Sequence, residues 1–244
     1  MNILRKTCKI VNRSFFISIF VENSIYNMTE KFTIEDLFIK IIPGGVLVGI
    51  LYFVYGHQLN LEPTKGLDFF YTFLFFTFSF LSGEIIQTIA HELEFLVHLF
   101  FKCNKPSQIF LYKENPVLKN ENIRIEIIKH LSIEDEILTN YNKSYKELRW
   151  FKKDKKSKNR CQGYFWKIYT NVSAEVEIKV FNRNYLLTRG ITIVCLMSTV
   201  IFSIEQNIPF IIGSIVLFLM FLWRARGMAR TLVFKTVLLN LKKE

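Results

Sequence analysis

Residues 67–101 form a stretch of about 35 positions without a proline, long enough for one continuous helix. The first half, residues 68–81, is apolar and rich in phenylalanine. Together with the positions that follow, it can cross the hydrocarbon core of a bilayer, which needs roughly 20 apolar residues. The second half, residues 83–98, places carboxylates and imidazoles where lipid would reject them. The first half therefore predicts an integral membrane protein, and the second half raises the question of function.

The overall composition agrees with a membrane protein. Half of the 244 residues are hydrophobic and 16% are aromatic, as expected for a chain that exposes much of its surface to lipid. The last two apolar spans are separated by a short turn, in which Asn207 is suited to cap the next helix and Pro209 to occupy its first turn. Four spans are predicted in all, at residues 39–55, 67–101, 185–204 and 208–223.

The distribution of Lys and Arg among the loops predicts the orientation. Residues 102–184 contain 18 basic and 10 acidic residues, and residues 224–244 contain six basic residues and one acidic residue. The connections at 57–67 and 205–207 carry almost no basic residues. We therefore expect an all-α integral membrane protein with four transmembrane helices in two hairpins and a helical cytoplasmic insertion between helices 2 and 3. Both termini are expected in the cytoplasm, as in a bacterial inner membrane.

Five segments follow from this topology. Within the cytoplasmic one, we expect Ser132 to begin a helix, residues 152–160 to form a solvated loop, and residues 164–184 to form one helix that runs into the third span. The predicted order is an N-terminal extension with Met28 as an alternative start (1–38), the first transmembrane hairpin, whose second helix protrudes into the cytoplasm (39–101), a basic helical cytoplasmic domain (102–184), the second transmembrane hairpin (185–223), and an amphipathic basic C-terminal helix (224–244).

A polar stripe follows one face of the second predicted membrane helix. At 100° per residue, five ionisable or amide side chains fall within an arc of about 80°. They are Glu84, Gln87, His91, Glu94 and His98. In a membrane such a stripe must face protein, water or a ligand. It is either the face that the helix turns toward the cytoplasmic domain, or the lining of an assembly or permeation path.

A metal-dependent hydrolase is the alternative function for this stripe. The zinc-protease motif His-Glu-x-x-His requires two imidazoles one helical turn apart. Here His91 and His98 are two turns apart, about 10.5 Å along the helix axis, which is too far for comfortable chelation of one ion. Glu94 with either histidine could supply half of a site. We therefore expect no metal, no cofactor and no catalytic residue, and keep the hydrolase as an alternative.

A basic cluster lies in the predicted cytoplasmic domain. Such clusters bind anionic lipid headgroups or nucleic acid, or simply mark a loop that stays in the cytoplasm. Eight of the fifteen residues at 146–160 are basic: Lys146, Arg149, Lys152, Lys153, Lys155, Lys156, Lys158 and Arg160.

Gly45 and Gly49 form a small-x-x-x-small pair in the first span. Such pairs allow the backbones of two membrane helices to approach closely. They predict that the first span packs on another helix, although the same spacing also arises by chance in membrane helices.

The preferred function is that of a multi-pass membrane protein that self-associates and acts as a pore-forming or membrane-perturbing effector or as an accessory subunit. Its expected partners are the lipid bilayer, anionic lipid headgroups and further copies of the chain. A cytoplasmic protein is a further candidate partner. A second alternative function is that of a membrane-tethered adaptor that binds nucleic acid or anionic lipid through its basic cytoplasmic loop. No sequence motif identifies a family. In outline, the chain is similar to small four-span membrane proteins that accompany bacterial defence systems.

Overall fold

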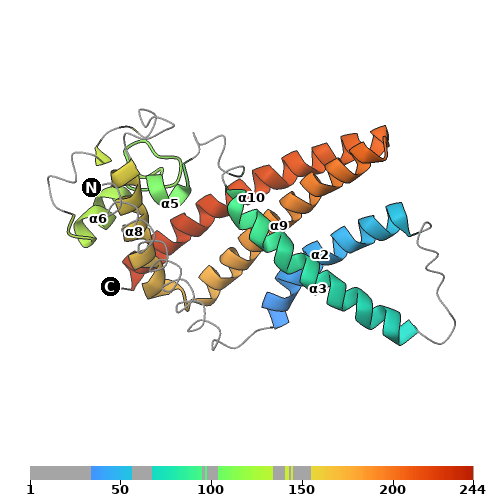
Figure 1. Cartoon of the computed structure of the whole chain (residues 1–244). Helices are drawn as coiled ribbons and strands as arrows, with labels where there is room; N and C mark the ends of the chain where they lie inside the picture. Colours follow the sequence, from blue (N-terminus) through green and yellow to red (C-terminus); the bar gives the residue numbers. More distant parts are fainter. Residues whose placement is uncertain are drawn as a thin grey trace, which may run out of the picture. The chain divides into compact units, whose positions relative to one another are not determined.

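The computed structural model describes residues 34–56, 68–94, 97, 104–133, 141–142, 144 and 155–243. The regular structure of these residues is helical, apart from an isolated bridge between Lys113 and Ser144. The helices are α2 (Ile34–Tyr55), α3 (Asp68–Glu92), α5 (Pro106–Ile109), α6 (Glu121–His130), α8 (Lys155–Val172), α9 (Val176–Ile204) and α10 (Ile208–Lys242), drawn in Figure 1.

Four of these helices are long and apolar enough to cross a membrane. This confirms the all-helical prediction and the number of candidate spans. The chain divides into a unit at residues 1–38, of which the first residues of α2 are described, and a unit at residues 39–244. The candidate spans are Leu37–Tyr55, Phe69–Glu92, Val176–Ile204 and Ile208–Lys242.

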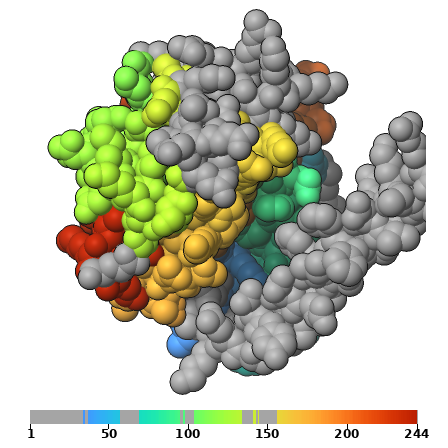
Figure 2. All heavy atoms as spheres, turned by 90° about the vertical axis from the view of Figure 1, so that its left-hand side faces the viewer, coloured from blue at the N-terminus to red at the C-terminus, as the bar shows by residue number. Residues whose placement is uncertain are grey.

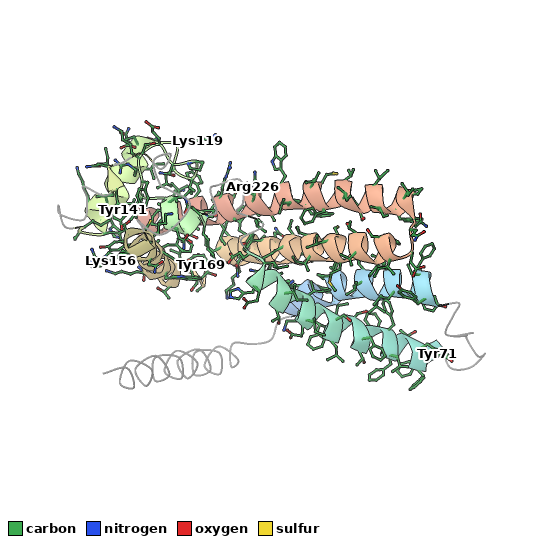
Figure 3. The ribbon with its side chains drawn as sticks, turned by 45° about the horizontal axis from the view of Figure 1, so that its top comes forward. Tyr71, Lys119, Tyr141, Lys156, Tyr169 and Arg226 are labelled. Carbon is green, nitrogen blue, oxygen red and sulfur yellow. The ribbon has the colours of Figure 1, made fainter. Side chains whose placement is uncertain are left out.

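Helices α9 and α10 form an antiparallel hairpin and lie side by side in Figures 1 and 3. The turn is tight because Gln206 adopts a left-handed conformation with φ 53°. Asn207 is the N-cap residue of α10, although its side chain makes no capping hydrogen bond, and Pro209 lies in the first turn as predicted. Between the two helices, the hydroxyl oxygens of Thr199 and Ser214 are 2.9 Å apart and share a hydrogen bond.

Helix α10 continues without a break from the hairpin to Lys242, over 35 residues. The predicted C-terminal helix at 224–244 is therefore the continuation of the fourth span. Its apolar side chains Val233 and Val237 pack into a core that α5, α6 and α8 share. We call this region, residues 104–133, 155–172 and 232–242, the helical lobe. Figure 2 looks onto the lobe end of the molecule, where side chains of α6 (green), α8 (yellow to gold) and the end of α10 (red) reach the surface.

Buried polar contacts join the parts of the lobe. The Arg124 side chain on α6 is buried, forms an ion pair with Glu121 at 2.5 Å and donates to the carbonyl oxygen of Leu111 at 3.0 Å. The rings of Tyr112 and Tyr141 meet edge to face, with centroids 5.2 Å apart. Burial raises the pKa of the Tyr141 hydroxyl well above its usual range. These bonds satisfy polar groups that would otherwise destabilise a small core.

Two local predictions in this region are wrong. The predicted helix 164–184 is broken, because α8 ends at Val172 and Glu175 adopts an extended conformation as the N-cap of α9. The break lets Val172 and Ile178 both pack against Leu232. The predicted solvated loop 152–160 is helical from residue 155 onward, since the apolar side chains that follow bury one face of α8. The helix expected from Ser132 lies mostly outside the described residues.

Candidate functional site

The polar stripe of α3 begins at Glu84, whose carboxylate forms an ion pair with Lys40 on α2. The Lys40 ammonium also lies 5.5 Å from the centroid of the Phe80 ring. Charge-assisted bonds of this kind are among the stronger ones in proteins. The first member of the predicted stripe is thus paired within the chain.

Two glycines allow the backbones of α2 and α3 to touch beside this ion pair. A Cβ atom added at Gly44 would lie 1.7 Å from the carbonyl oxygen of Ser79, and one added at Gly83 would lie 2.0 Å from that of Lys40. Only glycine fits at such distances. The predicted pair fits less well: a Cβ at Gly45 would meet Ser79 at an ordinary 3.4 Å, and one at Gly49 would meet nothing within 4 Å.

The next member, Gln87, joins three helices. Its amide nitrogen donates to the carbonyl oxygens of Ile39 on α2 and Leu186 on α9, both at 3.3 Å. A Cβ at Gly190 would come within 2.6 Å of this nitrogen, so the glycine makes room for the amide. The Gln87 carbonyl oxygen is buried and has no hydrogen-bond partner. Gln87 therefore links the two hairpins through backbone acceptors.

Glu94 is the last described member of the stripe and contacts two partners. Its carboxylate forms an ion pair with Lys105, next to α5, and accepts a 3.0 Å hydrogen bond from the Tyr185 hydroxyl on α9. The Arg189 guanidinium lies 5.6 Å from the centroid of the Tyr185 ring. Arg189 is only 7% exposed, and its Nε atom has no hydrogen-bond partner.

The two histidines of the stripe take no part in these contacts as far as the structure describes them. His91 is exposed at the end of α3, beside the exposed Glu92, and His98 lies outside the described residues. Among the residues that are described, no group of three His, Cys, Asp or Glu side chains could hold a metal ion.

The basic cluster is described only in part. Lys156, Lys158 and Arg160 lie in the first turns of α8, with Lys156 and Arg160 exposed and Lys158 buried. The side chain of Lys155 and all of Lys146, Arg149, Lys152 and Lys153 lie outside the described residues. The described members of the basic cluster therefore lie in α8, a helix of the lobe, and not in a loop.

Sequence reasoning missed the side chains that bind the stripe, which are Lys40, Lys105 and Tyr185, and also Arg189, which lies beside the Tyr185 ring. One signal for two of them was present, since Lys40 and Arg189 are cationic residues at the ends of apolar spans, where a charge needs a counter-charge or a polar partner. In the described residues, the stripe forms ion pairs and side-chain hydrogen bonds that link α3 to α2, to α9 and to the lobe. No protein-family model, curated protein or solved structure matches this chain.

Proposed function

We propose that the protein is an integral membrane protein that self-associates, and that its assembled form acts on the bilayer as a pore-forming or membrane-perturbing effector. The observation that carries this proposal is the exposure of the aromatic half of α3, residues 68–81. The exposed fraction is 86% for Phe69, 59% for Phe73 and 55% for Phe78.

These phenylalanines surround the helix and do not form a single stripe. At 100° per residue, Phe69 and Phe78 point in opposite directions, and the exposed Phe70, Phe75 and Phe76 fill directions between them. Figures 1 and 3 show the reason: beyond their crossing, α2 and α3 diverge toward the ends that residues 57–67 connect. Apart from the crossing with α2 at Ser79, most large side chains of this half of α3 are therefore exposed, and a helix that is apolar all round needs an apolar surrounding.

A second copy of the chain is the partner that these exposed phenylalanines favour over lipid. Helix association within lipid depends on close packing, because lipid tails are as apolar as the side chains that they would release. Aromatic pairs contribute about 0.5–1.5 kcal/mol beyond the area that they bury. Six exposed phenylalanines therefore offer a packing gain that acyl chains do not match.

The proposed orientation places the helical lobe and both termini in the cytoplasm. Its support is the charge distribution of the loops, with 18 basic residues in 102–184 and almost none in the two opposite connections. The alternative hydrolase gains no comparable support, because Glu84 and Glu94 are both engaged in ion pairs with lysines.

The test uses the full chain in liposomes. Subunit number is measured by single-molecule photobleaching at rising protein-to-lipid ratio, and leakage is measured with an entrapped dye on the same preparation. The variant F73L/F76L/F78L keeps the helix apolar but removes the aromatic rings. We expect it to shift the protein toward monomers and to reduce leakage.

A matched control changes three exposed apolar residues of α10, as I212V/I215V/L219V. It should leave both subunit number and leakage as they are in the wild type. A wild-type protein that stays monomeric at every ratio would overturn self-association. Oligomers without leakage would overturn the action on the bilayer and leave the assembly in place.

A further inference from the structure

All charged residues of helix α8 are basic. Its 18 residues include five Lys and Arg and no Asp or Glu. Apolar side chains at helical spacing bury one face of it against α10 and the rest of the lobe; they are Cys161, Phe165, Ile168 and Val172. The opposite face stays exposed along the whole helix, whose two ends are marked by Lys156 and Tyr169 in Figure 3.

We define the exposed face of α8 by the residues that occupy it. A tryptophan lies in its middle, and the glycine one turn earlier faces open space, since a Cβ at Gly163 would meet nothing within 4 Å. Trp166 is 53% exposed, although its ring contacts Tyr169 edge to face at 5.4 Å. The exposed face consists of Lys156, Asn159, Arg160, Gly163, Trp166, Lys167 and Thr170.

The charges on this face are available to a partner. Among the described residues, Lys156, Arg160 and Lys167 form no ion pair, whereas Lys235 and Lys243 elsewhere in the lobe region are paired with Glu177 and Glu175. The three free cations extend over about 16 Å along the helix. A polyanion with charges at regular intervals would match this row.

The position of α8 favours a partner from the aqueous phase. Its side chains reach the surface at the lobe end of the molecule, away from the hairpin turns of the candidate spans (Figures 1 and 2). An exposed indole between cations is also the arrangement that stacks on an unpaired base while cations bind the phosphates.

We propose that the exposed face of α8 binds single-stranded nucleic acid. Arg160 and Lys167 contact backbone phosphates on either side of a base that stacks on Trp166, and Lys156 extends the contact by one further phosphate. Duplexes fit less well, because their bases are stacked on one another and leave no free face for the indole.

The test measures the fluorescence anisotropy of a labelled single-stranded oligonucleotide with the full chain in nanodiscs of zwitterionic lipid. We expect W166A to weaken binding roughly 5- to 150-fold, as for the loss of one stacked base. The W166F variant should recover part of that loss, because phenylalanine also stacks.

The charge variant R160Q/K167Q should weaken binding and lower the slope of log K against log salt by about 1.4, which is about 0.7 per phosphate contact on a single strand. The matched control K119Q/K129Q removes two exposed lysines elsewhere on the lobe and should change neither the affinity nor that slope by as much. Circular dichroism of each variant verifies that it is folded.

Three results would overturn the proposal. The first is an affinity of W166A equal to that of the wild type. The second is a response of K119Q/K129Q as large as that of R160Q/K167Q, which would indicate attraction by net charge alone. The third is tighter binding to anionic vesicles or to a duplex than to the single strand, which would assign the face to lipid or to double-stranded nucleic acid.

Discussion

Lys40 on α2 and Glu84 on α3 form an ion pair directly beside the point where Gly44 and Gly83 bring the two helix backbones into contact. The pair and the backbone contact depend on each other. Without the glycines the helices could not approach, and without the carboxylate the partly buried lysine would lose this ion pair.

This relationship predicts the outcome of removing Glu84. The substitution E84L should lower the free energy of unfolding in detergent by about 1–3 kcal/mol, because it removes the ion pair between Glu84 and the partly buried Lys40 ammonium. The double substitution K40M/E84L replaces the whole pair by apolar groups and should recover most of this stability. Thermal unfolding of E84L, of K40M/E84L and of the wild type measures both the loss and its recovery. A stable E84L protein with reduced leakage would instead assign Glu84 to a permeation path.

The glycines provide a second prediction with an internal control. G83A and G44A should each destabilise the protein by about 1–3 kcal/mol or more, because the added Cβ collides with a backbone oxygen. G49A should be neutral, since a Cβ there meets nothing within 4 Å. Denaturation by heat or by a graded increase in denaturing detergent compares the three. Equal sensitivity of all three positions would contradict the observed crossing.

A third prediction concerns pH and the core of the lobe. Burial raises the pKa of the Cys161 thiol and of the Tyr141 hydroxyl above their usual values of 9.0 and 10.0. Both groups are thus neutral in the folded lobe but ionise in the unfolded chain once the pH exceeds those values. The free energy of unfolding should keep its full value below about pH 9 and decline as the pH rises further, since the unfolded state then binds fewer protons than the folded state.

Melting temperatures between pH 8 and 10.5 measure this decline, and C161S should make it shallower. The neutral thiol should also react with maleimide far more slowly in the folded protein than in the denatured one, because the thiolate is the reactive form. Fast labelling of Cys161 under native conditions would show that the lobe opens readily.

Topology gives a fourth prediction. In the proposed orientation, a cysteine introduced at position 60 should be labelled by an impermeant thiol reagent from outside the cell, and one introduced at position 156 only after the membrane is permeabilised. The native cysteines are replaced by serine for this experiment. External labelling at position 156 would rule out a cytoplasmic lobe.

The sequence was sufficient to predict the elements that depend on local properties. Apolar length identified the four candidate spans, and Asn207 with Pro209 located the turn between the last two. The break at 173–175 was missed because the residues there are compatible with a helix. It arises because Val172 and Ile178 both pack on Leu232, a residue about sixty positions away.

The contacts of the stripe were beyond prediction for the same reason. The period of one helix shows that Glu84, Gln87 and Glu94 share a face, but the register between helices decides what that face meets. The small-residue spacing pointed to Gly45 and Gly49, whereas the crossing uses Gly44 together with Gly83 of the other helix. A pair of glycines on different helices leaves no spacing signal in the sequence.

The unbroken course of α10 has a mechanical consequence. A straight helix of 35 residues is about 52 Å long and behaves as a stiff lever, with one end in the hairpin turn and the other among the apolar side chains of the lobe. In a thinner bilayer a long apolar helix increases its tilt, by fractions of a kcal/mol per Å of mismatch. The lobe is attached to the far end of that helix, so in the proposed membrane-inserted form each change in bilayer thickness would swing the lobe relative to the membrane surface.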